Sequence, residues 1–95
     1  MLAASRRPVV VDFRAAWCGP CRAFAPTFAE AAARHPELLF AKVDTDANLQ
    51  LSAQLAIRSI PTLVIFREGR PVERVSGALP AAQFEQWLAA AAPTP

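Results

Sequence analysis

The stretch Trp17-Cys18-Gly19-Pro20-Cys21 constrains the fold of this 95-residue chain more than any other. It contains both cysteines of the protein and follows an apolar, β-branched run that begins at Val9. The residues after it, as far as Arg34, have the apolar spacing that is typical of an amphipathic helix. We therefore expect a buried strand, a turn that carries the cysteine pair, and a helix that begins at the motif.

The spacing of Cys18 and Cys21 suits reversible disulfide chemistry. Residues i and i+3 on the first turn of a helix lie on one face, close enough to form a disulfide. Unpaired N–H groups and the positive end of the helix dipole favour a thiolate at Cys18, which is therefore the predicted nucleophile. Cys21 lies one turn further in and is the predicted resolving thiol.

The other residues of the motif fit a substrate-contacting role. Pro20 is tolerated in a first helical turn, where its missing N–H has no partner to lose. Gly19 leaves room for an approaching substrate, and Trp17 places a large flat surface beside the reactive sulfur. We predict that all three contact the substrate.

Two other uses of the cysteine pair are open at this point. A structural disulfide over so short a loop gains little from constraining the unfolded chain. A zinc site usually takes four Cys or His ligands, and this chain offers Cys18, Cys21 and His35. A zinc or iron–sulfur site would therefore need ligands from a second chain.

The segment Val11-Asp12-Phe13, followed by Ala16 to Cys21, resembles the active-site segment of the thioredoxin family. The other matching segments are Pro26, Ala41-Lys42-Val43-Asp44, Ile57 to Thr62 and Gly77-Ala78. The chain resembles most closely the C-terminal domain of thioredoxin 2, without the zinc module that precedes that domain. The resemblance covers nearly the whole sequence, in order.

The resemblance implies an α/β fold, in which a central mixed sheet of about four strands is flanked by helices in three layers. We expect a single, N-terminally shortened thioredoxin-like domain over residues 1–95. The predicted strands are Val9–Phe13, Leu38–Val43, Leu63–Phe66 and Pro71–Val75, and the predicted helices are Cys18–Arg34, Ala47–Ala56 and Pro80–Ala91. Only seven residues precede Pro8, too few for the family's first strand and helix. We expect either reduced stability or self-association across the strand edge that this exposes.

Asp12 is out of place in an apolar strand, because an ionised carboxylate is costly there unless it is paired. The resemblance implies that it lies under the disulfide, has a pKa raised by burial, and relays protons to Cys21. The alternative is a strand-end residue that faces solvent or caps a turn. The resemblance also implies that Lys42 tunes Asp12; otherwise this lysine simply faces solvent.

The segment around Ile60-Pro61 is the second functional element that the resemblance implies. In the family the matching peptide bond is cis and packs against the cysteines, and the residue before the proline pairs with an extended substrate. A plain strand-entry proline is the alternative. Gly77 matches a glycine at the rim of the substrate groove, although packing or a positive φ would explain it equally well.

These residues predict a protein dithiol–disulfide oxidoreductase that reduces the disulfides of client proteins. The predicted redox group is the Cys18–Cys21 disulfide, with no bound cofactor and no metal. The resemblance implies that thioredoxin reductase, which draws on NADPH, restores the dithiol. A rival hypothesis is a binding module that keeps the fold without the catalysis.

Charge and hydropathy argue against two other classes of partner. A net charge of +2 is too small to indicate nucleic acid, and no apolar run approaches the ~20 residues of a membrane span. No signal-like apolar core follows Arg6 and Arg7. We therefore expect a cytoplasmic protein in a reducing compartment.

Overall fold

The strand β1, Val9–Arg14, lies inside a four-stranded sheet with the order β2-β1-β3-β4. The computed structural model describes residues 7–91. The other elements are α1 (Gly19–Arg34), β2 (Leu39–Asp44), α2 (Leu49–Gln54), β3 (Thr62–Arg67), β4 (Arg70–Ser76) and α3 (Ala81–Ala91). β2 is parallel to β1, whereas β3 and β4 each run antiparallel to their inner neighbour. The predicted mixed α/β fold is therefore confirmed, and most element bounds agree within one or two residues.

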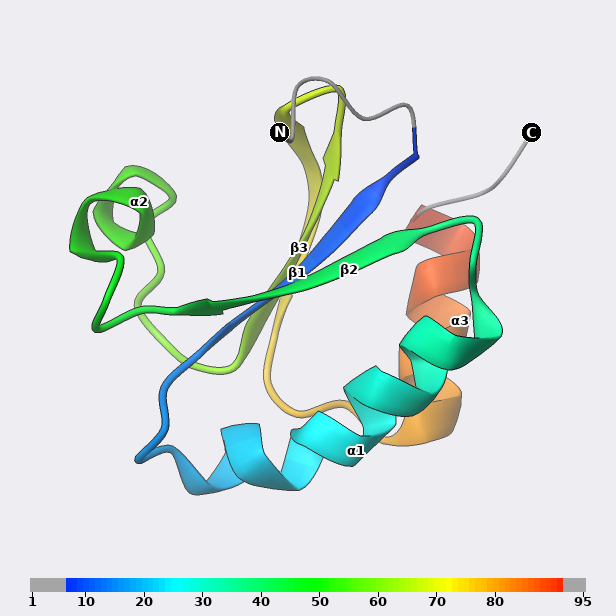
Figure 1. Ribbon diagram of the computed structural model, residues 1–95, viewed down its shortest axis with the longest axis horizontal. Coiled ribbons are helices and arrows are strands. Elements are labelled where there is room, and N and C mark those ends of the chain that lie inside the picture. Colours follow the sequence, from blue (N-terminus) through cyan, green and yellow to red (C-terminus); the bar gives the residue numbers. More distant parts are fainter. Residues whose placement is uncertain (1–6, 92–95) are drawn as a thin grey trace.

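The side chains of β1 are buried on both faces of the sheet, as its continuous apolar run predicted. Val10 packs in a cluster with the inner faces of α1 and α3. Val9, Val11 and Phe13 belong to a second cluster, which includes side chains of α2. Figure 1 shows the resulting layers, with α1 and α3 on one side of the strands and α2 on the other.

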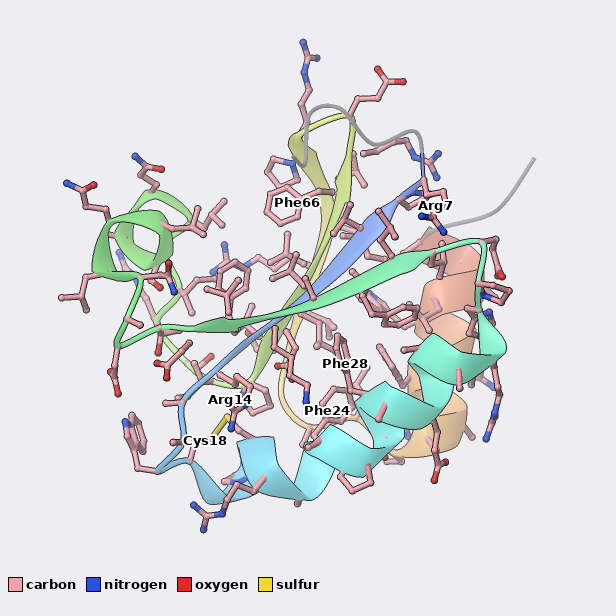
Figure 2. All side chains as sticks on the ribbon, viewed as in Figure 1. Arg7, Arg14, Cys18, Phe24, Phe28 and Phe66 are labelled. Carbon is pink, nitrogen blue, oxygen red and sulfur yellow. A yellow bond between two sulfur atoms is a disulfide. The ribbon has the colours of Figure 1, made fainter. Side chains whose placement is uncertain are left out.

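Aromatic side chains hold α1 and α3 together over the sheet. Phe24 and Phe28 are one helical turn apart on α1, with ring centroids 6.1 Å apart, and both point towards the strands in Figure 2. The rings of Phe84 on α3 and Phe24 pack edge to face, with centroids 5.1 Å apart. All three rings are buried, so this face holds the larger part of the core.

His35 connects the end of α1 to α3. Its Nε2 lies 2.6 Å from a carboxylate oxygen of Glu85, and its Nδ1 lies 2.9 Å from one of Glu37. The hydrogen bonds to Glu85 and then Glu37 raise the pKa of the imidazole above its ordinary value of 6.5. His35, which the sequence offered as a possible zinc ligand, thus links the end of α1 to α3.

The opposite face is covered less completely. A hollow of about 200 Å³ opens among apolar side chains of β1, β2, β3 and α2. Its lining residues are Val11, Phe13, Ala41, Lys42, Val43, Leu51 and Phe66. β2 is an edge of the sheet in the described residues, as predicted, and its side chains are half-buried or exposed. The uncovered apolar surface lies on the α2 side of the sheet, away from α1.

Candidate active site

The two cysteines form a disulfide at the start of α1. Cys18 is the N-cap residue, with an extended backbone, and its sulfur accepts a hydrogen bond from the Cys21 N–H at 3.2 Å. The Cα atoms of the pair are 5.2 Å apart. Gly19 and Pro20 are the first two helical residues, as the motif predicted. A donor N–H and the helix dipole therefore both act on the Cys18 sulfur.

The cysteine pair is almost completely buried. In the disulfide form 4% of Cys18 is exposed, against none of Cys21. The difference has the expected sign but is small, because Ala15 and Ile60 pack around the pair. The Cys18 sulfur lies 3.8 Å from the Ile60 carbonyl oxygen. In the disulfide this is a packing contact, since only the reduced thiol carries a proton to donate.

The loop before the disulfide is held by two polar contacts that the sequence did not predict. The Trp17 indole is 68% exposed, and its N–H donates to the Asp46 carboxylate at 2.8 Å. Arg22 donates from α1 to the Ala16 carbonyl oxygen at 2.9 Å. A Cβ added at Gly19 would meet no atom within 4 Å, so the space beside this residue is open.

The Ile60–Pro61 peptide bond is cis. Ile60 packs against the buried cluster of Ala15 and the two cysteines. The Pro61 carbonyl oxygen accepts a hydrogen bond from the Gly77 N–H at 2.8 Å. Gly77 has φ +104°, a conformation that favours glycine. The two segments named by the resemblance thus meet, and Ile60 borders the disulfide.

Asp12 lies on the β1 face that α1 covers, because alternation places it on the same side as Val10. It is completely buried, and neither carboxylate oxygen has a hydrogen-bond donor. Burial raises its pKa from 3.8 to about 6, although the charges of Arg14 and then Lys42 oppose the increase. Asp12 is therefore not the solvent-facing strand end that we considered as its alternative.

Lys42 is paired in register with Asp12 across the parallel strands β1 and β2, and its side chain is exposed. Its charge lowers the Asp12 pKa less than that of Arg14 does, and a role in tuning Asp12 stays a prediction. Arg14 is the stronger of the two cations in its effect on Asp12, and we did not predict that role. The available signal was its position two residues after Asp12, on the same face of the strand.

A cysteine pair at a helix N-terminus, a cis-proline beside it and a buried carboxyl behind it define a class of protein, the thiol–disulfide oxidoreductases. The described residues contain no group of three or more His, Cys, Asp or Glu side chains that could hold a metal ion. None of the helices between residues 7 and 91 has the length and apolar character needed to cross a membrane.

Comparisons with known proteins agree with this class. The thioredoxin family model matches residues 1–90. Thioredoxin C-3 of Corynebacterium nephridii is 51% identical over 85% of this chain, which spans 56% of that relative's length. The thioredoxin of Alicyclobacillus acidocaldarius is 48% identical over 87% of the chain and 80% of its own length. A crystal structure of Fasciola hepatica thioredoxin superposes with a TM-score of 0.85, at 39% identity, over 92% of this chain and 83% of that one.

The chain belongs to the thioredoxin family. It is a thiol–disulfide oxidoreductase whose redox-active group is the Cys18–Cys21 disulfide. Proteins of this family act without a bound cofactor, and NADPH supplies their electrons indirectly, through thioredoxin reductase. The finer assignment to the thioredoxin 2 branch stays a prediction.

Proposed function

We propose that Cys18 is the nucleophile and Cys21 the resolving thiol in the reduction of client protein disulfides. The Cys18 thiolate attacks one sulfur of the client disulfide, and the other client sulfur leaves as a thiolate. The Cys21 thiolate then attacks Cys18, which releases the second client thiolate and closes the Cys18–Cys21 disulfide. Two electrons pass to the client. The observation that carries this assignment is the Cys21 N–H aimed at the Cys18 sulfur at the start of α1.

Asp12 is the proposed proton acceptor for Cys21. Resolution needs a deprotonated Cys21, and a buried carboxylate on the face that α1 covers is a suitable base. Its pKa of about 6 keeps most of the group ionised at neutral pH, while leaving it basic enough to take a proton. Lys42 tunes this carboxyl from the neighbouring strand.

The client segment is proposed to bind in extended form across the cis-proline. The Ile60 backbone would pair with the client main chain, in the manner of strand addition at a sheet edge. The remaining contact surface would be formed by Trp17, Gly19, Pro20, Pro61 and Gly77. The exposure of Trp17 and the open space in front of Gly19 support this arrangement.

The partners follow from the same chemistry. Clients are proteins with accessible disulfides, and thioredoxin reductase returns the oxidised pair to the dithiol. We further propose that residues 1–95 form a single domain that acts in the cytoplasm. Two copies would associate through the β2 edge and the apolar hollow beside it. The mostly apolar lining of the hollow supports this association. Sedimentation of the chain as a monomer at all concentrations would contradict the association.

The experiment that tests the function is NADPH consumption in the presence of thioredoxin reductase and a protein disulfide. We expect turnover by the wild type, none by Cys18→Ser, and a trapped mixed disulfide with Cys21→Ser. Glu73→Gln, on the exposed strand β4, is the matched control and should turn over normally. Turnover that survives Cys18→Ser, or an inactive wild type, would favour the rival binding module.

A further inference from the structure

Arg14 is the last residue of β1, and its side chain lies on the same face as that of Asp12 two residues earlier. The Arg14 carbonyl oxygen accepts hydrogen bonds from Thr45, from the N–H at 2.9 Å and from the hydroxyl at 3.3 Å. These contacts fix the backbone from which the guanidinium projects. The chain then turns directly into the cysteine motif, and Figure 2 shows Arg14 and Cys18 at the same end of the molecule.

Neither Arg14 nor Asp12 has a hydrogen-bond partner for its buried atoms. The Arg14 Nε is buried and has no acceptor, and both Asp12 oxygens are buried without a donor. The Arg14 Nε and the Asp12 carboxylate are shielded from water, although Arg14 as a whole is only half-buried. Charges that share one face of a strand and are partly shielded in this way interact more strongly than they would in bulk solvent. Each is therefore positioned to act on the charge of the other, without a direct ion pair.

The other groups around Asp12 leave Arg14 as its principal counter-charge. Lys42 faces it from β2, but its side chain is exposed and its charge is screened by water. Leu63 is its neighbour on β3 and is apolar. α1 contributes Cys21 from its buried face, and the buried side chains of α3 are apolar.

We propose that Arg14 is a positioning residue of the redox site, whose guanidinium keeps Asp12 ionised so that the carboxylate can accept the Cys21 proton. The inference rests on the proposed function and adds one residue to it. In the step concerned, the proton moves from the Cys21 thiol to Asp12, and the resulting thiolate attacks Cys18. The bond between Cys18 and the client breaks, and the client sulfur leaves with the electron pair.

The electrostatics of the buried carboxyl support this role. Burial raises the Asp12 pKa, and the charge of Arg14 lowers it more than that of Lys42 does. Removal of the guanidinium would therefore leave a smaller ionised fraction at neutral pH. Because each unit of pKa is a tenfold change in the ratio of the two forms, even a modest increase would slow resolution at pH 7 and move its pH profile upward.

The test is a direct titration of Asp12 by carboxyl ¹³C NMR in the oxidised protein, in which neither cysteine titrates. We expect Arg14→Gln to raise the Asp12 midpoint by about 0.5 to 1 pH unit, and Arg14→Lys by less than half of that. Lys42→Gln should give a smaller increase than Arg14→Gln. Arg70→Gln, at the start of the exposed strand β4, is the matched control and should leave the midpoint unchanged.

Two results would overturn the inference. One is an Arg14→Gln midpoint within about 0.2 unit of the wild type, and the other is an equal shift in Arg14→Lys and Arg14→Gln. Arg14→Met, which keeps the length of the stem, repeats the test if the glutamine variant does not fold. The titration needs no client protein. An inactive wild type would therefore contradict the proposed function, whereas the effect of Arg14 on Asp12 would still be tested by the titration.

In the active protein the same variants should change the rate of resolution. A mixed disulfide between Cys18 and a small aromatic thiol releases the thiol when Cys21 attacks, which absorbance follows directly. The pH midpoint of this release should move upward in Arg14→Gln by the same amount as the NMR midpoint. A slower release with an unmoved pH midpoint would assign Arg14 a purely structural role and contradict the proposal.

Discussion

Replacement of Asp12 by asparagine should flatten the pH dependence of the stability of the oxidised protein. Burial raises the Asp12 pKa from 3.8 to about 6 in the folded state. In the unfolded chain the carboxyl ionises near its ordinary value. Between these two values the folded state retains a proton that the unfolded state has lost, so the free energy of unfolding falls as the pH rises through this window and is constant above it.

The size of the effect follows from the two pKa values. A difference of about two units corresponds to roughly 3 kcal/mol, since each unit is about 1.4 kcal/mol. Some of that difference is already lost at pH 4, so between pH 4 and pH 7.5 the expected change is about 2 to 3 kcal/mol. Asparagine has nearly the same shape as aspartate, and its neutral amide has the same lack of partners at both pH values.

The assay is guanidinium unfolding of oxidised wild type and Asp12→Asn at pH 4 and at pH 7.5. His35 titrates in both proteins, so its contribution cancels when the two changes are subtracted. We expect the asparagine variant to gain stability relative to wild type as the pH rises. A difference between the two changes of less than about 0.5 kcal/mol would refute the reasoning, because Asp12 would then ionise in the folded state as it does in the unfolded one.

Three further outcomes are expected. Glu85 and then Glu37 raise the His35 pKa in the folded state. The difference in the free energy of unfolding between wild type and His35→Gln should therefore be largest below pH 6.5 and should decline as the pH rises through the folded pKa. Denaturant unfolding at pH 6 and at pH 9 measures this difference. Phe28→Ala should cost about 3 to 5 kcal/mol, seen as a lower urea midpoint, because its buried ring touches both α1 and α3 neighbours. Gly77→Ala should cost about 1 to 3 kcal/mol at φ +104° and also slow client reduction, and an unchanged melting temperature would contradict it.

The strands and the cysteine site could be predicted because their signals are local. The β-branched apolar run Val9–Val11, followed by Phe13, is typical of a strand buried on both faces, and all the side chains from 9 to 13 are buried. The cysteine spacing likewise indicates the start of α1, since a thiol pair three residues apart and Pro20 both suit a first helical turn. The cis bond before Pro61 came only from the family resemblance, because sequence alone gives an X-Pro bond a small chance of being cis.

The part that could not be predicted depends on contacts between distant residues. The sequence predicted a helix over 47–56, whereas α2 covers only Leu49–Gln54. At its start, the Asp44 carboxylate accepts the N–H groups of the turn that follows β2. At its end, Ala56 has a positive φ, and Arg74 from β4 donates to the carbonyl oxygens of Leu55 and Ala56. No periodic pattern in the sequence encodes such a pairing.

The contacts of His35 and Trp17 were missed for the same reason. The His35–Glu85 contact joins residues 50 positions apart, and the Trp17–Asp46 bond joins residues 29 apart. Arg14, only two residues from Asp12, was assigned no role from the sequence. Its influence on Asp12 becomes visible once the strand's faces are assigned and the carboxyl is found to be buried.

The two faces of the sheet are covered unequally, so substitutions that affect stability can be separated from substitutions that affect the redox chemistry. The cysteines and Asp12, the proposed proton acceptor, belong to the side closed by α1 and α3, whereas the hollow belongs to the side that α2 shields only in part. Substitutions that fill or widen that hollow would alter how firmly the molecule holds together, yet they would not touch an electron- or proton-carrying group. Substitutions on the α2 side of the sheet could therefore raise the free energy of unfolding without changing the redox chemistry.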